Sequence, residues 1–220
     1  MEKKKGAVMA EFKILQDQFS YFNAPISNVK PARTLTTEEV ACIVGSDELR
    51  EYTLRLRQLV RLKEEGKADK KEVQAYKAAH LPCVTWSTLC RLRRASEVES
   101  HSENLCLDID DITAWQATDT PLKQLHPDWP ISQLKGVEGL RYALRQDREL
   151  GCKLLFRSPS GTGLKVVTDI DLATGSHRDY YNAMVYYMLC RYGVEVDSAC
   201  SDLVRACYLC WDPDVTFNNH

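Results

Sequence analysis

The chain has 220 residues, of which 44% are hydrophobic and 27% are charged, so it is long enough for one substantial core and is not of disordered composition. It begins MEKKKGAVMAEF, which lacks the apolar run of a secretory signal, and no later stretch approaches the roughly 18 apolar residues of a membrane span. We therefore expect a cytoplasmic protein without membrane association, with a single domain over residues 1–220. Its nine cysteines are expected to be reduced core residues, because a chain of this size does not need disulfides.

Charge is distributed unevenly along the chain. Residues 50–94 carry twelve Lys or Arg against five Asp or Glu, whereas residues 97–128 carry eight acids against Lys123 alone. Such runs are typical of solvated helix faces. A basic surface beside an acidic centre also suits a protein that attracts a polyanion and neutralises part of its charge with metal ions.

Hydrophobic periodicity and turn residues divide the first half of the chain into five segments. In order, we expect a strand at 11–22, a helical segment at about 36–80, a β-rich stretch at 81–89, a polar loop at 93–104 and a short strand at 105–110. Thr36 or Thr37 and Ser46 are expected to cap the helical segment, because their side chains can accept hydrogen bonds from free backbone N–H groups.

Helices and strands also alternate in the second half. In order, we expect a loop at 126–130, a helix at 131–151 ended by Gly151, a hairpin at 152–172, a helix at 176–193 ended by Gly193, and one or two strands at 194–213. A hairpin among helices favours an α+β fold, with a mostly antiparallel sheet and helices on one face.

The stretch LCLDIDDI, residues 105–112, places three carboxylates at the end of a buried strand. Asp108 and Asp110 are two residues apart, so on a strand their side chains leave the same face with α-carbons roughly 6.5 Å apart, and Asp111 should point elsewhere. Two carboxylates on one face can bind Mg²⁺ or Mn²⁺, and two-metal sites hold their ions about 3.5–4 Å apart. Asp is also common where strands turn into solvent.

Asp169 and Asp171 form a second Asp-x-Asp at the end of another apolar strand. A turn-like Leu-Ala-Thr-Gly-Ser and a helix follow them, so they are more easily explained as turn residues at the exit of a strand. We therefore favour Asp108 and Asp110 as the metal-binding pair.

The stretch FRSPSGTGLKVV, residues 156–167, contains a loop of small residues between two strands. Small residues leave backbone N–H groups accessible to phosphate oxygens, and Lys165 adds a positive charge on the outgoing strand. The candidate nucleotide-binding residues of this loop are Ser158, Ser160, Gly161 and Gly163. The loop has neither the Gly-Lys-Ser/Thr of a P-loop nor the third Gly of a dinucleotide fingerprint, so it is either a phosphate cradle or an ordinary hairpin loop.

Three stretches separated by helices give the chain a family resemblance. They are a strand that ends LDID, the stretch SPSGTGLK, and the stretch VDSACSDLVRACYLCWDPD. Over roughly residues 81–214 it resembles the archaeo-eukaryotic primase superfamily of primase-polymerases. More narrowly, it resembles the primase-like N-terminal domains of virulence-associated-E-type proteins of mobile elements. The resemblance implies an RRM-like catalytic core with three motifs: metal-binding Asp108 and Asp110, a nucleotide-contacting strand matching Ser160 to Lys165, and a third acid matching Asp197.

The chain also departs from that superfamily. Lys165 stands where most members have histidine, and the helical segment at about 36–80 matches none of the motifs. The sequence contains no helicase-like ATPase module, which is usual on such proteins, and it ends at FNNH directly after a strand-like run. We therefore expect a fragment of a longer protein, with a helicase-like ATPase as a further domain or a partner.

The resemblance implies a metal-dependent nucleotidyltransferase that adds nucleotides from nucleoside triphosphates on a nucleic-acid template in mobile-element replication. Two Mg²⁺ or Mn²⁺ would be held by three acids, Asp108, Asp110 and Asp197. Lys165 and the loop would hold the triphosphate. Arg205 is a candidate phosphate ligand because its planar guanidinium suits phosphate oxygens, although a salt bridge to Asp202 explains it equally well. The template would lie on the basic surface of residues 50–94.

Two other functions remain open. A catalytically degenerate primase fold would only bind nucleic acid or nucleotide, since a fold does not guarantee an activity. A rolling-circle nicking protein would attack DNA with a tyrosine of the helix at 176–193, namely Tyr180, Tyr181, Tyr186 or Tyr187. That chemistry usually needs clustered metal-binding histidines, and the five histidines here are scattered along the sequence.

Cys207 and Cys210 have the spacing of half a zinc site. A second pair is missing, and an offset of three on a strand sends the two thiols to opposite faces. We therefore expect buried thiols.

Overall fold

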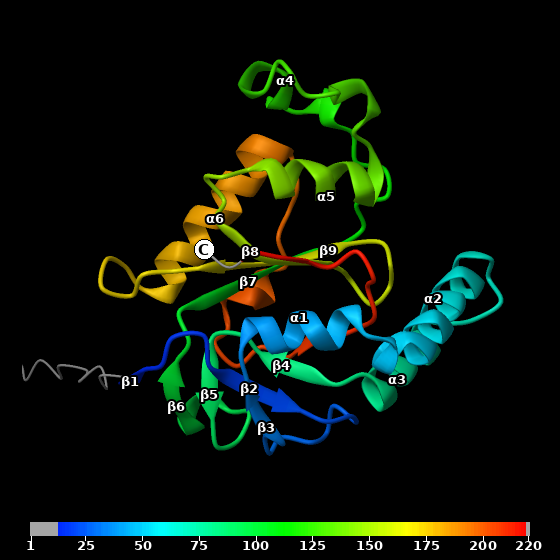
Figure 1. Ribbon diagram of the computed structural model, residues 1–220. Coiled ribbons are helices and arrows are strands. Elements are labelled where there is room, and N and C mark those ends of the chain that lie inside the picture. Colours follow the sequence, from blue (N-terminus) through cyan, green and yellow to red (C-terminus); the bar gives the residue numbers. More distant parts are fainter. Residues whose placement is uncertain (1–12, 219–220) are drawn as a thin grey trace, which may run out of the picture.

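The computed structural model describes residues 13–218, and its central element is a four-stranded sheet with the strand order β11-β8-β9-β7 (Figure 1). Every neighbouring pair in this sheet is antiparallel. The strands are β7 (Asn104–Ile109), β8 (Cys152–Arg157), β9 (Leu164–Asp169) and β11 (Thr216–Phe217). The predicted hairpin is confirmed as β8 and β9, and the predicted strand at 105–110 is confirmed as β7. The fold is therefore α+β with antiparallel sheets.

Side chains of β7 alternate between the two faces of the central sheet. Leu105 and Leu107 lie in a core that contains side chains of α5 (Gly136–Gln146) and α6 (His177–Tyr192), the two helices that cover this face in Figure 1. Cys106 lies in the core on the opposite face. Because neighbours on a strand alternate, Asp108 belongs to the same face as Cys106.

The opposite face of the central sheet is covered by α1 (Thr37–Gly45) and by a second four-stranded sheet with the order β10-β4-β2-β3 (Figure 1). Its strands are β2 (Phe19–Phe22), β3 (Arg33–Leu35), β4 (Cys83–Thr85) and β10 (Cys207–Tyr208). A third sheet has the order β1-β6-β5, with β1 (Lys13–Ile14), β5 (Thr88–Cys90) and β6 (Val98–His101). The β-rich stretch at 81–89 is thereby confirmed.

The helices α2 (Arg50–Glu64) and α3 (Lys70–His80) project together to one side of the molecule and are called the helical arm below (Figure 1). Thr36 caps α1 through a capping box with Glu39, and Ser46 caps the short 3-10 helix η1 (Asp47–Leu49). The predicted helical segment and two of its caps are therefore confirmed.

Two predictions for the first half were wrong in extent. The single strand at 11–22 is two short strands in different sheets, because the chain turns between them at Asp17, whose φ is 54°; residues 11 and 12 lie outside the described residues. The polar loop at 93–104 contains the 3-10 helix η2 (Ala95–Glu97) and the strand β6, whose sheet pairing outweighs its polar composition.

In the second half, the helix predicted at 131–151 is shorter. A 3-10 helix, η4 (Ile131–Gln133), precedes α5, and α5 ends at Gln146 because Asp147 accepts hydrogen bonds from the N–H groups of Glu149 and Leu150. Gly151 lies instead in the turn into β8. Gly193 ends α6 in the left-handed conformation, as predicted.

The remaining short elements are η3 (Ala117–Asp119), α4 (Leu122–Leu125) and η5 (Ser198–Ser201). The loop at 126–130 is confirmed. The strands predicted at 194–213 are reduced to the two residues of β10, since η5 takes up part of that stretch. Among the helices between residues 13 and 218, none is both long and apolar enough to cross a membrane.

Candidate active site

A cleft of about 670 Å³ lies where the end of β7, the β8–β9 loop, the segment 197–208 and the helical arm meet. The predicted site residues that line it are Asp108, Asp110, Asp197, Ser158, Ser160, Lys165 and Arg205. Gly161 and Gly163 do not line it. The structure thus brings the three acids and most of the predicted phosphate-binding side chains to one cavity.

The two oxygens of Asp108 have different environments. Lys165 lies directly opposite Asp108 in the β7–β9 register, and its ammonium group donates a hydrogen bond to Asp108 Oδ2. Asp108 Oδ1 is buried and has no hydrogen-bond partner among the described residues. Burial alone would lower the pKa of Lys165, but the neighbouring Cys207 and the carboxylate of Asp108 raise that pKa above its ordinary value. Lys165 is therefore a fixed positive charge in the floor of the cleft.

Asp110 follows β7 at the cleft edge. The residue is exposed overall, but the cleft walls partly desolvate its carboxyl group, and this burial together with the charge of Asp108 raises the pKa of Asp110. A cation bound near both carboxylates would offset the same repulsion.

Asp197 is fixed beside Asp108 through the main chain. Its N–H donates to the carbonyl oxygen of Asp108 at 2.9 Å. Its Oδ1 accepts from the N–H of Ala199 at 3.0 Å, and its Oδ2 pairs with Arg205 at 3.1 Å. The alternative in which the Arg205 side chain pairs with Asp202 is therefore wrong, because this side chain pairs with the third acid of the cleft instead.

Asp111 differs from its predicted orientation, since it also lines the cleft. It adopts a φ of 51°, so the chain turns immediately after β7 and strand alternation no longer decides where this side chain points. The Asp111 carboxylate accepts a hydrogen bond from Thr162 at 3.4 Å, which places it at the base of the β8–β9 loop.

The β8–β9 loop presents hydroxyl groups to the cleft. The hydroxyl oxygens of Ser158 and Ser160 are 3.0 Å apart, and those of Ser160 and Thr162 are 2.9 Å apart. Backbone N–H groups, which were predicted to face the cavity, are mostly used inside the loop: that of Gly161 donates to the Ser158 carbonyl and that of Gly163 to the Ser158 hydroxyl. Phosphate oxygens would therefore meet hydroxyl groups here more than amides.

Packing explains both glycines of this loop. A Cβ atom on Gly163 would lie 2.2 Å from the carbonyl oxygen of Ile109, so only glycine allows β9 to start this close to the end of β7. Gly161 has a φ of 82°, and a Cβ atom there would lie 3.2 Å from Nε of Arg57.

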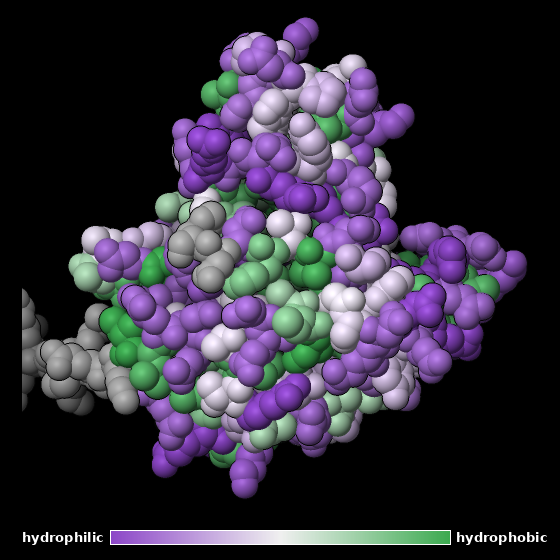
Figure 2. All heavy atoms as spheres, viewed as in Figure 1, coloured by the Kyte–Doolittle hydropathy of each residue, from purple (hydrophilic) through white to green (hydrophobic). Residues whose placement is uncertain are grey.

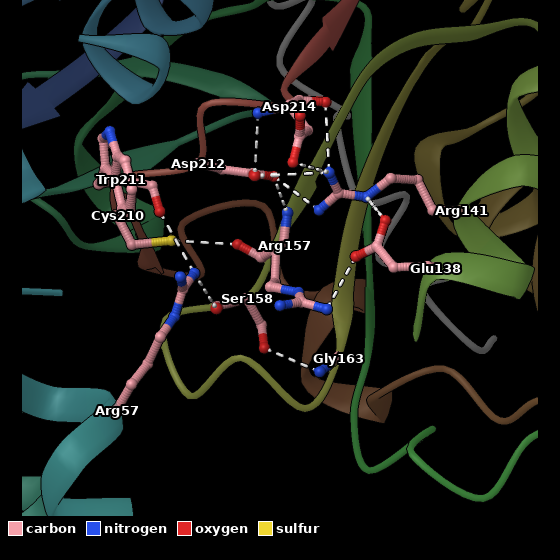
Figure 3. Close-up of polar contacts among 10 residues, drawn as sticks. All are labelled: Arg57, Glu138, Arg141, Arg157, Ser158, Gly163, Cys210, Trp211, Asp212 and Asp214. Atoms are coloured by element: carbon pink, nitrogen blue, oxygen red, sulfur yellow. Dashed lines mark hydrogen bonds and ion pairs between the residues drawn. The ribbon is translucent and has the colours of Figure 1, made fainter. Parts of the chain in front are cut away.

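A polar network behind the loop anchors its first residues (Figure 3). Arg141 of α5 pairs with Asp212 at 2.8 Å, and both side chains are only 4% exposed. Asp212 also accepts from the N–H of Arg157 at 2.6 Å. Arg57 of the helical arm donates to the carbonyl oxygens of Trp211 at 3.2 Å and Ser158 at 3.5 Å.

Sequence reasoning missed this anchor. One signal for it was present: Arg141 lies four residues after Val137 and three before Leu144, and both of these are buried on the apolar face of α5. A charged residue on such a face needs a buried partner. Nothing local identified Asp212 or Arg57 as that partner or as a second contact to the loop.

The second Asp-x-Asp has the structural role predicted for it. Asp169 pairs with Lys153 at 2.9 Å, and the Asp171 carboxylate accepts from the N–H of Ala173 in the turn after β9. Both residues line a separate cavity of about 590 Å³.

The cysteines of the segment 207–210 are buried thiols, as predicted. Cys207 Sγ lies 4.0 Å from Cys106 Sγ, and the Cys210 thiol donates to the Arg157 carbonyl at 3.0 Å. Cys207 and Cys210 therefore have different partners.

The cleft offers oxygen ligands to a divalent cation. The unpartnered Oδ1 of Asp108 and the raised pKa of Asp110 both fit a cation bound between these two residues. As the side chains stand, residues 13–218 contain no group of three His, Cys, Asp or Glu positioned to hold a metal ion. Lys165 and Arg205 pair with two of the three acids, so a metal ion would bind Asp197 in exchange for Arg205.

Residues 130–217 are similar to a family model described as "BT4734-like, N-terminal domain". The matched part includes the β8–β9 hairpin, Asp197, Arg205 and the Arg141–Asp212 pair, and it begins after the strand that carries Asp108. Comparison with curated proteins found no match, and comparison with solved structures found none either.

Proposed function

We propose that this protein is a metal-dependent nucleotidyltransferase of the primase-polymerase type, which adds nucleotides from nucleoside triphosphates on a nucleic-acid template in mobile-element replication. The observation that carries the proposal is the cleft itself, where Asp108, Asp110 and Asp197 line one cavity with the Ser158–Ser160 loop and Lys165. The antiparallel central sheet with α5 and α6 on one face supports an RRM-like core of that type.

The charge of the cleft suits this substrate. Its lining carries five positive and five negative formal charges: Lys63, Lys70, Lys77, Lys165 and Arg205 against Glu64, Asp108, Asp110, Asp111 and Asp197. The difference is zero, so two divalent ions would bring the lining to a charge of about +4, which suits polyanionic substrates such as a nucleoside triphosphate and a nucleic-acid strand.

Each residue of the floor has a defined task in this proposal. Two Mg²⁺ or Mn²⁺ on the three acids would activate a 3′ hydroxyl and stabilise the leaving pyrophosphate. Lys165, held by Asp108, provides a positive charge that does not depend on metal binding. Arg205 pairs with Asp197 in the absence of ligand and can turn to phosphate oxygens, because half of its side chain is exposed. The hydroxyl groups of Ser158 and Ser160 would donate to the triphosphate.

One observation favours a second candidate, a degenerate primase fold that only binds nucleotide or nucleic acid. Lys165 and Arg205 already neutralise Asp108 and Asp197, so these two acids have partners without metal ions.

Two further parts of the proposal rest on the sequence alone. They are a helicase-like ATPase as a further domain or partner, and a cytoplasmic location.

The test compares Asp108→Asn with Asp169→Asn, a matched change at the end of the neighbouring strand and outside the cleft. Primer extension and triphosphate binding are measured with Mn²⁺ for both variants and the wild type. We expect Asp108→Asn to lower extension by at least about a hundredfold, since losing one ligand charge weakens stabilisation of the transition state, and Asp169→Asn to retain the activity.

Wild-type protein that binds triphosphate with Mn²⁺ but extends no primer would support the degenerate fold. If the wild-type protein binds no triphosphate at all, both the nucleotidyltransferase and the degenerate fold are contradicted.

A further inference from the structure

The helical arm forms a second, basic wall of the cleft. Its residues in the lining include Lys63 from α2 and Lys70, Gln74 and Lys77 from α3. Lys70 and Lys77 are seven residues apart, which is two helical turns, so both lie on the same face of α3 about 10 Å apart along its axis. Gln74 lies between them on that face.

The arm is held against the floor of the cleft at its base. The Trp211 N–H donates to the Thr53 hydroxyl at 2.8 Å. Figure 3 shows how Arg57 reaches the carbonyl oxygens of Trp211 and Ser158. Trp211 and Ser158 adjoin the residues that the Arg141–Asp212 pair anchors. The basic wall therefore has a defined position relative to the acids.

The lysines of this wall differ from the cations of the floor. Lys165 pairs with Asp108 and Arg205 with Asp197, whereas within residues 13–218 none of the wall lysines, Lys63, Lys70 and Lys77, forms an ion pair. Lys77 is half-buried, and its ammonium nitrogen lies 5.1 Å from the centre of the Tyr208 ring. Hydrophilic side chains cover the arm in the space-filling view (Figure 2). The wall thus keeps positive charges free for a ligand.

We propose that this wall, with Lys63, Lys70 and Lys77, binds the sugar–phosphate backbone of a single nucleic-acid strand opposite the three acids. The inference rests on the proposed function in one respect, the role of the strand as template or primer. A row of cations along a helix suits a chain of phosphates, whereas the floor already provides Lys165, Arg205 and the loop hydroxyl groups for a triphosphate. The cleft volume of about 670 Å³ equals that of a cube with an edge of roughly 9 Å. A duplex is wider than its own major groove of about 12 Å, so the cleft is too small to enclose a duplex and favours a single strand.

The test measures binding of fluorescein-labelled 20-nucleotide homopolymers of DNA and of RNA by anisotropy, without triphosphate or divalent metal. The double variant Lys70→Gln/Lys77→Gln is compared with Lys67→Gln/Lys71→Gln, which removes one charge from the connection between α2 and α3 and one from α3, both outside the cleft lining. We expect the first to weaken binding about tenfold at low salt and to reduce the slope of log K against log salt by about 1.4, because each lost phosphate contact contributes about 0.7. The second should change binding less than about twofold, and DNA and RNA should behave alike because they share the phosphate backbone.

Equal losses in both double variants would overturn the inference, since the arm would then act through its total charge. It would also be overturned if the Lys70/Lys77 variant bound oligonucleotides normally and lost affinity only for ATP. Circular dichroism and urea unfolding of each variant separate a binding defect from a folding defect. The two proposals can also fail separately. If the wild type fails to bind ATP with Mn²⁺, while both it and Asp108→Asn bind the oligonucleotides, the proposed function is contradicted and the basic wall is supported.

Discussion

The two ends of the β8–β9 loop contact carboxylates that are used in opposite ways. Behind the loop, Asp212 accepts hydrogen bonds from Arg141, from the N–H of Arg157 and from the N–H of Asp214, so both of its oxygens have partners. In the cleft, Asp108 pairs with Lys165 through one oxygen, and its other oxygen is buried and has no hydrogen-bond partner between residues 13 and 218.

This difference separates a structural ion pair from one that retains binding capacity. A buried carboxylate whose acceptor positions are all filled adds rigidity and cannot bind another ligand without losing a partner. A carboxylate with an unfilled buried oxygen is less stable in the free protein and gains a partner when a cation arrives. The first kind of site holds the loop in place, and the second kind is available for chemistry.

The largest effect that would test this comparison is the removal of charge behind the loop. Asp212→Asn leaves the buried Arg141 guanidinium with only two exposed acids among the described residues, Glu138 at 3.6 Å and Asp214 at 4.0 Å, and we expect the free energy of unfolding to fall by about 3 kcal/mol. Urea denaturation followed by tryptophan fluorescence measures the change.

The control is the double variant Arg141→Met/Asp212→Asn, which removes the unpaired charge and keeps an amide oxygen for the Arg157 N–H. We expect it to recover more than half of the loss, because replacing both partners of a buried pair is often nearly neutral. A double variant as unstable as the single one would show that the anchor depends on packing around Asp212 and not on its charge.

Acid titration gives a second, intermediate effect from two buried histidines, neither of which forms an ion pair within the part of the chain that the structure describes. Burial lowers the pKa of His101 and His177 to about 4, and their rings are 5.5 Å apart. Between pH 6.5 and 4 the unfolded chain therefore binds protons that the folded chain does not, so stability falls as the pH falls. At pH 5 we expect a loss of up to about 2 kcal/mol for each histidine relative to pH 7.

Urea denaturation at pH 7, 6 and 5 measures this loss, and His177→Gln provides the control because glutamine can still bond the Ser87 hydroxyl. We expect the variant to lose less stability between pH 7 and 5 than the wild type. If the variant lost as much stability as the wild type between pH 7 and 5, groups other than His177 would cause the loss. The ion pairs on the two sides of the loop would then have to be compared above pH 7, where that loss is absent.

The smallest expected effect is that of Asp108→Asn on stability. The variant removes the charge that pairs with the Lys165 ammonium group. Lys165 lines the cleft and keeps the nearby charge of Asp110, and the repulsion between Asp108 and Asp110 is relieved, so we expect the free energy of unfolding to stay within about 1 kcal/mol of the wild type. The same urea experiment detects it. If Asp108→Asn lowered the free energy of unfolding as much as Asp212→Asn does, Asp108 would be a structural carboxylate like Asp212.

Local signals in the sequence were sufficient for the hairpin, the helical segment and the end of β7. Apolar runs bounded by small residues predicted β8 and β9, and strand alternation predicted that Asp108 and Asp110 would share a cavity. Asp111 was misplaced because a positive φ ends the alternation at that residue. The short strand β6 was missed because its stability comes from pairing with β5 and β1, which no local pattern encodes.

Contacts between distant residues explain the rest of what could not be predicted. The Arg157–Asp212 and Arg57–Ser158 contacts join positions 55 and 101 residues apart. The small residues of the loop suggested free amides, but the structure uses those amides within the loop and presents hydroxyl groups instead. Composition can predict that a loop is compact, whereas the direction of its donors depends on how it packs.

The hydrogen bond from the Asp197 N–H to the Asp108 carbonyl gives this cleft a practical property. Because this bond joins main-chain atoms, an exchange of either side chain for its amide alters the electrostatic field and leaves both partners of the bond in place. One acid or both can therefore be exchanged for amides, which gives a graded series of proteins that share this backbone contact. Such a series would allow metal affinity to be titrated against the number of carboxylates.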